Sequence, residues 1–422
     1  MIPALLAVFA ITQSPLHADV ERRTAAIMDS VVAWRRDLHR HPELSNRETR
    51  TSGIVAAHLR RLAIDVRSTA RTGVVGVLRG GRPGPVVALR ADMDALPVTE
   101  ETGLPFASRE RSTYNGQEVG VMHACGHDMH TAMLMGAASV LAGMRQQLPG
   151  TVVFVFQPAE EGPPAGEDGG APLIMREGAL NDPAPSAMFG LHVFSRIPTG
   201  RLDVRPGPMM ASSDQFRIVV KGRQTHGALP WRGVDPVVVG AQVILGLQTI
   251  ASRQIDATLA PAVISIGQVN GGIRFNIIPD SVVLIGTVRA FNEDMRRDIH
   301  ERIRATATHI AASAGAEAAV TINLGNAVTA NDTALAERML PSLRRAGTTA
   351  TAQLTTTAED FSAYSQRMRT LFVFLGVTPP ESVMDTVPAN HSPRFLADEA
   401  ALPVGVKALS YLAVDYLLNQ MR

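Results

Sequence analysis

VVALRADMD, at residues 86–94, is an apolar run that follows Gly84 and Pro85 and ends in two carboxylates. Short apolar runs bounded in this way are typical of strands buried on both faces of a sheet. Similar runs recur along the chain, at residues 74–78, 151–156, 187–193 and 371–375. Helical patterns accompany them, at residues 19–62 (interrupted at His41-Pro42-Glu43), 129–146 and 400–418. The alternation predicts an α/β domain with a mostly parallel sheet flanked by helices.

The pattern changes near Pro206. A strand pattern at 216–220 is followed by a helical pattern at 235–252, two more strand patterns and a second helical pattern, at 262–269, 281–288 and 292–314. This order predicts a small α+β module inserted into the larger domain. We therefore expect a larger domain in two parts and an insertion between them, with bounds 19–205, 206–320 and 321–422.

Bulk composition narrows the class of protein. The chain has 422 residues, enough for two or three domains, and 45% of them are hydrophobic. Its net charge of +1 gives no electrostatic basis for binding nucleic acid or an acidic membrane surface. The single cysteine, Cys125, excludes an intramolecular disulfide.

Residues 1–18 carry no acidic or basic side chain apart from His17 and are mostly apolar. The stretch is too short for a transmembrane helix and is typical of a secretory signal peptide cut after Ala18, although its first residues lack Lys and Arg. We expect a periplasmic or secreted protein. The alternative is a cytoplasmic protein with an apolar N-terminus.

Side chains that bind divalent metals stand at the ends of several predicted strands. Cys125 and His127 lie two residues apart before a predicted helix, where a thiolate and an imidazole can reach one ion. His192 closes a strand and His391 lies in a polar turn, although lone histidines are more often structural. Cys125 could instead be a nucleophile activated by a histidine. The joint occurrence at strand ends favours a metal centre, because buried imidazoles and carboxylates are costly unless paired or metal-bound.

Two pairs of carboxylates occupy similar positions. Asp92 and Asp94 end one strand, and Glu160 and Glu161 directly follow the run 151–156. Adjacent carboxylates at a strand end point in different directions, so one can bind metal while the other acts as a general base. The structural alternatives are turn capping for the aspartates and a solvated loop for the glutamates.

Ten runs occur in order over about residues 30–415: RRDLHRHPELSNRE, ALRADMDALPV, MHACGHDMHTAML, VFVFQPAEEG, GLHVF, THGALPWRGVDP, GGIRFNIIPD, GTVR, TAEDFSAY and NHSPRF. Together they resemble the amidohydrolase branch of the aminoacylase-type zinc peptidases. That branch includes hippurate hydrolases, bacterial N-acyl-amino-acid deacylases and plant auxin-conjugate hydrolases. The resemblance implies a zinc-peptidase-like catalytic domain, an inserted lid and dimerisation domain, and two divalent ions, either manganese, zinc or cobalt.

The resemblance also implies roles for individual residues. Its metal ligands match Cys125, His127, Glu161, His192 and His391. Its general base matches Glu160, and Asp94 matches an acidic residue that orients a metal-bound histidine. In the implied mechanism, Glu160 takes a proton from a metal-activated water that attacks the amide carbonyl.

Three further matches lie in the inserted module and would stay unassigned without the resemblance. His226 matches a residue that reaches across a dimer into the partner's active site, where it stabilises the oxyanion. Asn276 and Arg289 match positions that hold the free carboxylate of the substrate, for which arginine is suited by its bidentate geometry.

The resulting expectation is a metal-dependent amidohydrolase that cleaves N-acyl amino acids as a homodimer or higher oligomer. We expect no nucleic-acid partner and no stable membrane insertion. A dipeptidase or carboxypeptidase of the same fold is the first alternative, followed by a non-catalytic binding protein and a thiol amidase using Cys125. The loop at residues 163–172 is longer than in the shortest family members and lies near the implied ligands in sequence, where it can shape the acyl pocket.

Overall fold

The computed structural model describes residues 15–419, which divide into two compact units. Within these residues, the first unit runs to Val204, includes Ala334–Thr351 and resumes at Met368. The second unit comprises Arg205–Thr333 and Ala352–Arg367. The predicted boundary at residue 320 falls inside strand β15 (Glu317–Leu324), which pairs with β10 (Asp214–Lys221) and so belongs to the second unit.

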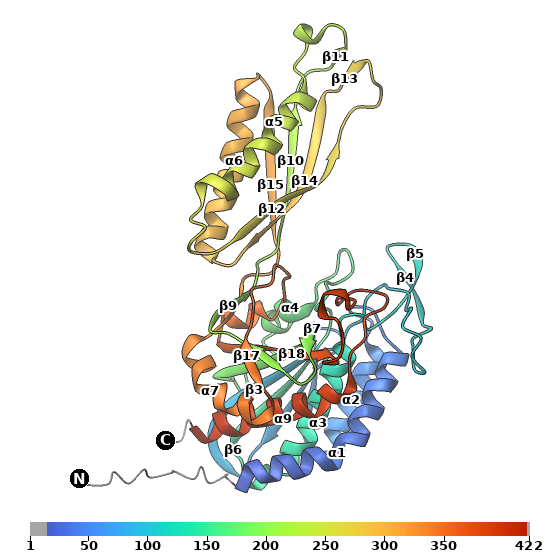
Figure 1. The fold of residues 1–422 in the computed structure, drawn as a ribbon, viewed down its shortest axis with the longest axis vertical. Helices are drawn as coiled ribbons and strands as arrows, with labels where there is room; N and C mark the ends of the chain where they lie inside the picture. Colours follow the sequence, from blue (N-terminus) through green and yellow to red (C-terminus); the bar gives the residue numbers. More distant parts are fainter. Residues whose placement is uncertain (1–14, 420–422) are drawn as a thin grey trace, which may run out of the picture. The chain divides into compact units, whose positions relative to one another are not determined.

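The first unit contains an eight-stranded sheet whose four central strands, β6, β3, β7 and β18, run parallel (Figure 1). This confirms the predicted α/β fold with a mostly parallel sheet. Antiparallel pairings are confined to the neighbours of this central block. The strands in spatial order are β1 Asp65–Thr69, β2 Gly73–Arg79, β6 Pro149–Gln157, β3 Arg82–Asp92, β7 Ala187–Pro198, β18 Arg369–Thr378, β8 Leu202–Val204 and β17 Thr349–Thr351.

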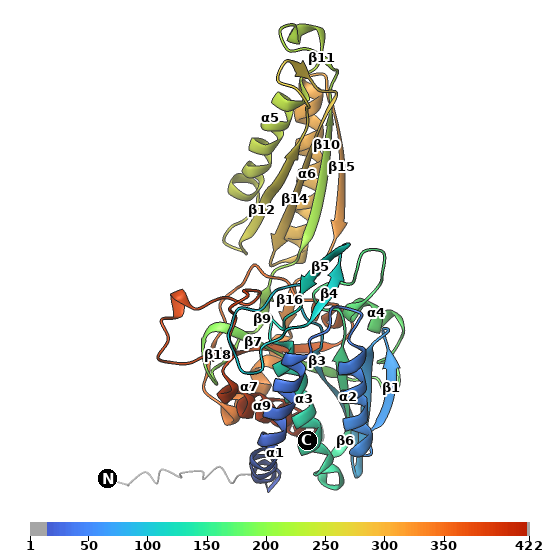
Figure 2. The same ribbon diagram turned by 90° about the vertical axis from the view of Figure 1, so that its right-hand side faces the viewer.

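Helices cover this sheet and bury its apolar strands (Figure 2). Helices α1, α3 and α9 pack against one another, and α3 and α9 also contact β3 and β7. Pro42 follows the end of α1, as expected of a residue that lacks a backbone donor. The helices are α1 Pro15–Arg40, α2 Thr49–Arg61, α3 His127–Ala142, α4 Gly170–Arg176, α7 Thr333–Ala346 and α9 Leu402–Asn419, and a small hairpin joins β4 Arg111–Tyr114 to β5 Gln117–Gly120.

The second unit is an antiparallel sheet in the order β12-β14-β10-β15, covered on one face by α5 and α6 (Figure 1). Burial alternates residue by residue along β14, as expected when only one face of a sheet is covered. Asp235 and Asn292 cap the two helices through their side chains. The elements are β12 Ala262–Asn270, β14 Ser281–Ala290, α5 Pro236–Thr249 and α6 Glu293–Ser313, with short pairs β11 Thr225–His226 and β13 Ile277–Ile278, and β9 Gly207–Met210 and β16 Thr329–Asn331; α8 (Ser362–Ser365) also lies in this unit.

Two helical stretches have the length and apolar composition of a membrane span, residues 236–254 and 399–419. Most of the second is buried inside the first unit, where α9 packs on β3, β6 and β7. Packing against the sheet accounts for its apolar composition. The first stretch contains α5, whose buried side faces the sheet of the second unit.

Residues 1–14 of the predicted signal peptide lie outside the described residues. Its last four residues form the start of α1, where Leu16 is buried in the apolar core. Nε2 of His17 lies 2.6 Å from Oδ1 of Asp415. A cut after Ala18 would remove both of these contacts.

Candidate metal centre

The polar residues after β3 and β6 lie at one edge of the sheet because these strands run parallel. In the register of the two strands, Asp92 is opposite Gln157. Asp94 and the Glu160–Glu161 pair follow within a few residues. The carboxyl ends of parallel strands are where α/β folds place their sites, and here they place the predicted acidic residues together.

A left-handed glycine brings Cys125 and His127 to the same place. Gly126 has φ +91° and precedes α3, whose first residue is His127. A β carbon at Gly126 would lie 2.2 Å from Cγ2 of Val193. Glycine is required here both for the backbone conformation and for space, and the turn lets two side chains two residues apart reach one site.

The five side chains that the resemblance implies as ligands converge. Sγ of Cys125 lies 3.3 Å from Nε2 of His192 and 3.3 Å from Nε2 of His391. Oε1 of Glu161 lies 3.2 Å from Nε2 of His391 and 3.9 Å from Nε2 of His127. The ligand atoms form two groups, Cys125 with His127 and His192, and Cys125 with Glu161 and His391, each within 4.8 Å. Cys125 is common to both.

The chemistry of this cluster fits a bound cation. Nε2 of His127 and Oε1 of Glu161 are buried without a hydrogen-bond partner. Burial lowers the pKa of His127, but Asp92 and Asp94 outweigh it and raise that pKa to about 10. Burial, together with Glu161, holds the pKa of the Cys125 thiol well above its usual value. The negative charges of Asp92, Asp94 and Glu161 contribute to these shifts, and a divalent cation bound here would neutralise them.

Asp94 contacts both the His127 ring and the backbone of Glu160 and Glu161. The Nδ1–H of His127 donates to the backbone oxygen of Asp94 at 2.8 Å, which leaves Nε2 facing the cluster. The Asp94 carboxylate accepts the backbone N–H groups of Glu160 at 3.1 Å and Glu161 at 3.0 Å, and the Ser45 hydroxyl at 2.7 Å. Such contacts orient a ligand and fix its tautomer. The orienting role expected for Asp94 is thus geometrically available.

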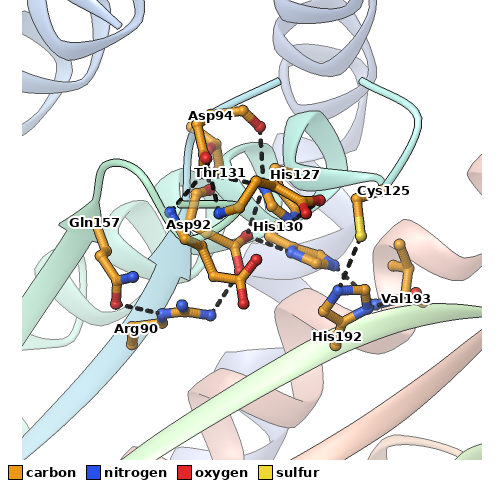
Figure 3. A network of polar contacts seen from close by, with 12 residues as sticks. Arg90, Asp92, Asp94, Cys125, His127, His130, Thr131, Gln157, His192 and Val193 are labelled. Carbon is orange, nitrogen blue, oxygen red and sulfur yellow. Dashed lines mark hydrogen bonds and ion pairs between the residues drawn. The ribbon is translucent and has the colours of Figure 1, made fainter. Parts of the chain in front are cut away.

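A second chain of contacts, which the sequence did not predict, orients His192 (Figure 3). The N–H of Val193 donates to Nε2 of His130 at 2.7 Å, so the proton of His130 is on Nδ1, 2.5 Å from Asp92. The Val193 oxygen accepts the Nδ1–H of His192 at 2.7 Å, which leaves Nε2 of His192 facing Cys125. Burial, together with His130, keeps the pKa of His192 well below its usual value, so the ring is neutral.

Asp92 is the buried anion of this chain. Its other oxygen accepts from Arg90 at 2.5 Å, and Arg90 also donates to Gln157 at 2.9 Å. The available signal in the sequence was the spacing of His130, three residues after His127 and therefore on the same side of a helix. Spacing alone could not show that His130 contacts Asp92 and the Val193 peptide.

Glu160 lies beside the ligands without belonging to the two groups described above. Its carboxylate is within 4.8 Å of ligand atoms of His127 and Glu161, and the residue is partly exposed. The predicted loop at residues 163–172 follows, but its last three residues belong to α4, and Glu167 in it forms an ion pair with Arg47 at 2.6 Å. A partly exposed carboxylate next to the ligand atoms is placed to exchange protons with a bound water.

Of the three predicted substrate residues of the inserted module, His226 and Asn276 lie together and Arg289 lies apart from them. His226 in β11 pairs with Ile277 in β13, and the N–H of Gly227 donates to the oxygen of Asn276 at 2.8 Å. Arg289 lies near the opposite end of β14, eight residues beyond Ser281. At about 3.4 Å per residue, that strand alone separates Arg289 from the His226–Asn276 end by roughly 27 Å.

Comparison with known proteins identifies the family. The family model described as peptidase family M20/M25/M40 matches residues 88–415. The chain belongs to this family. It is similar to N-acetylcysteine deacetylase of Bacillus subtilis (strain 168), with 38% identity over 92% of this chain and 97% of that protein. It is 37% identical to thermostable carboxypeptidase 1 of Saccharolobus solfataricus, over 92% of this chain and 96% of that one.

A solved structure supports the same assignment. The Bacillus subtilis YXEP protein, described as a dinuclear metal binding peptidase of the M20 family, superimposes with a TM-score of 0.79 and 36% identity. The alignment covers 93% of this chain and 99% of that one. With the candidate ligands of this M20 chain, the likeness supports a metal-dependent amidohydrolase.

Proposed function

We propose that this M20 protein hydrolyses the amide bond of N-acyl amino acids, including hippurate-like conjugates, to a carboxylic acid and a free amino acid. The observation that carries the proposal is the convergence of Cys125, His127, Glu161, His192 and His391, with Glu160 left beside them. The N-acetylcysteine deacetylase among its relatives supports an N-acyl substrate.

We also propose that the centre binds two divalent ions, manganese, zinc or cobalt, which Cys125, His127, Glu161, His192 and His391 would hold. The two ligand groups that meet at the Cys125 sulfur support that number. Divalent ions bound by these residues would lower the pKa of a water molecule and polarise the amide carbonyl. Asp94 and His130 hold the histidine ligands in the required tautomers.

The two adjacent glutamates have different roles in the proposed reaction. Glu160 accepts the proton of the attacking water at its carboxylate and returns it to the departing amine. Glu161 binds metal through Oε1, the atom that has no hydrogen-bond partner. His226 supplies a hydrogen bond to the developing oxyanion, and Asn276 and Arg289 hold the free carboxylate of the substrate.

We infer that the active form is a homodimer, because one copy of the inserted unit cannot bring His226 and Arg289 to one small substrate. The unit offers a surface for pairing. Strand β12 is at the edge of its sheet, and α5 exposes apolar side chains on the side away from the core, Val237, Val238 and Leu245. Uncovered edge strands and apolar patches are liabilities that association removes. A dilute monomer that sediments as one chain and keeps full turnover would contradict this.

The first alternative is a peptidase activity at the same site, which the similarity to a thermostable carboxypeptidase favours. The identities of the two relatives to this chain, 38% and 37%, differ by one percentage point, so identity does not choose between the substrates. Release of a C-terminal residue from peptides in preference to N-acyl amino acids would establish this alternative.

We propose further that residues 1–18 direct secretion to the periplasm or beyond. The support is their uncharged, mostly apolar composition. Sequencing the N-terminus of the protein from its native host tests this, and a mature chain that begins at Met1 would remove the basis of the proposal.

The function is tested by amine release from N-benzoylglycine, N-acetylmethionine, N-acetylcysteine and a dipeptide, before and after metal removal and after manganese is added back. We expect activity on an N-acyl substrate that metal removal abolishes and manganese restores. Activity that survives verified metal removal and is lost on alkylation would instead make Cys125 a nucleophile. Turnover of the dipeptide alone would favour the peptidase.

A further inference from the structure

Three successive backbone N–H groups at the end of β6 all donate to buried carboxylates. The N–H of Ala159 donates to Oε1 of Glu48 at 2.9 Å, and those of Glu160 and Glu161 donate to the two oxygens of Asp94. Asp94 had an expected role beside the metal ligands. Glu48 had none, and it lies 111 residues away from Ala159 in sequence.

Ala159 has a backbone conformation that alanine seldom adopts. Its φ is +53°, in the left-handed region, and the residue is 1% exposed. A β carbon disfavours this region, so a non-glycine residue persists there only where its surroundings fix it. The turn at Ala159 sets the directions in which the side chains of Glu160 and Glu161 leave the backbone.

Glu48 does not cap the helix that follows it, as its position would suggest. It is the residue that precedes α2, yet its side chain makes no capping hydrogen bond to that helix. Its carboxylate is buried and accepts instead from the N–H of Asn46 at 3.0 Å, the hydroxyl of Thr72 at 2.5 Å and the N–H of Ala159. Burying a carboxylate is costly unless its oxygens are hydrogen-bonded. Here one of the hydrogen bonds comes from Ala159, in the turn that directly precedes Glu160 and Glu161.

We propose that Glu48 is a positioning residue for Glu160 and Glu161: its carboxylate fixes the left-handed turn at Ala159 and thereby aims the base and the metal ligand that follow. This inference rests on the proposed roles of those two glutamates. What matters is the position of the Glu48 oxygen, because the contact that holds the turn is a hydrogen bond from one N–H group.

The chain contains a matched control. Ala70 is another buried alanine with positive φ, +46°, and its N–H donates to Oε2 of Glu177 at 2.7 Å. The Thr69 hydroxyl donates to the same oxygen at 2.7 Å. This turn joins β1 to β2 and contains none of the candidate ligands. A change at Glu177 therefore disturbs the same kind of turn and leaves the Glu48–Ala159 hydrogen bond in place, although Thr72 of this turn donates to the other oxygen of Glu48.

The test compares Glu48→Asp and Glu48→Gln with Glu177→Asp. Aspartate keeps the charge but withdraws the oxygen by one methylene, whereas glutamine keeps an oxygen in place and loses the charge. In Glu48→Asp we expect kcat to fall by about 10- to 100-fold with KM changed less than about threefold, because a small misplacement of a catalytic group has this effect. Glu48→Gln and Glu177→Asp should both stay within about threefold of the parent kcat.

Two readouts do not need a substrate. Hydrogen exchange of a peptide covering residues 155–162 should be faster in Glu48→Asp than in the parent and unchanged in Glu177→Asp. Titration of the metal-free chains with Co²⁺ alone should show weaker binding in Glu48→Asp, because Glu161 leaves the same turn.

The outcomes distinguish a failure of the role proposed for Glu48 from a failure of the proposed function. If Glu48→Asp behaves like Glu177→Asp in exchange, Co²⁺ binding and kcat, Glu48 does not position the loop. If Glu48→Gln is as impaired as Glu48→Asp, the charge matters and the position does not, which also overturns the proposal. If the parent turns over no amide substrate, the proposed function fails, while exchange and Co²⁺ binding still decide the role of Glu48.

Discussion

The carboxyl of Glu48 should give this protein an unusual dependence of stability on pH. Burial, together with the nearby charge of Asp94, raises the pKa of Glu48 from 4.5 to about 7. In the unfolded chain the group ionises near its ordinary pKa, so between the two values the folded state holds a proton that the unfolded state has lost. The contribution of Glu48 to stability therefore falls as pH rises from about 4.5 to about 7 and then levels off.

The size of the effect follows from the difference between the two pKa values. The difference is roughly 2.5 units, and each unit corresponds to about 1.4 kcal/mol, so the contribution of Glu48 to the free energy of unfolding should fall by about 3 kcal/mol across this window. Replacing Glu48 by glutamine removes the titrating group and keeps an acceptor for Ala159. Relative to the parent, Glu48→Gln should therefore gain about 3 kcal/mol between about pH 4.5 and pH 8.

The assay is urea denaturation of metal-free parent and Glu48→Gln proteins at several pH values, followed by circular dichroism. Removing metal is necessary because a bound cation would itself lower the pKa of a nearby carboxyl. Glu177→Gln is the control, since the pKa of Glu177 is lowered, first by the Ala70 N–H and then by Thr69. Parallel pH profiles of stability in the parent and Glu48→Gln would refute the reasoning.

Three further predictions concern the metal centre. Glu160→Gln should keep its metal and lose about 10²- to 10⁴-fold in kcat, whereas Glu161→Gln should lose metal, as measured by metal analysis beside steady-state kinetics; equal metal loss in both would contradict the division of roles. His130→Ala should weaken Co²⁺ binding by about 10- to 100-fold, seen by titration, because His192 loses its indirect support; unchanged affinity would show that the contact is only structural. Gly126→Ala, whose β carbon would lie 2.2 Å from Val193, should cost about 1–3 kcal/mol in thermal unfolding and reduce metal content, and a wild-type melting temperature would show that the turn can relax.

Local sequence was a good guide to the first unit because its strands are short apolar runs and its helices have clear boundaries. The runs at 86–89 and 151–156 lie within β3 and β6, and the expected break after α1 occurs at Pro42. Short polar strands lack apolar runs, so the sequence does not predict them. The predicted module ended at residue 320, inside β15. The exposed residues of β15 alternate with less exposed ones, and only its pairing with β10 identifies it as an edge strand.

The sequence by itself determined which kinds of side chain stand at the ends of the strands, because the order of apolar runs and the residues that follow them is local information. It placed Cys125 two residues from His127 and Glu160 next to Glu161. The family resemblance added roles to those positions. Neither the local sequence nor the resemblance could show which residues outside the motifs contact and orient these side chains.

Only the tertiary structure decided the contacts between distant segments. It joined Glu48 to Ala159 and His130 to the Val193 peptide, and it separated His226 from Arg289 along β14. These facts depend on strand register, on the packing of helices and on which buried polar groups find partners. Each of those is set by the whole fold, because a buried carboxylate or N–H group must be satisfied by whatever packing brings within reach.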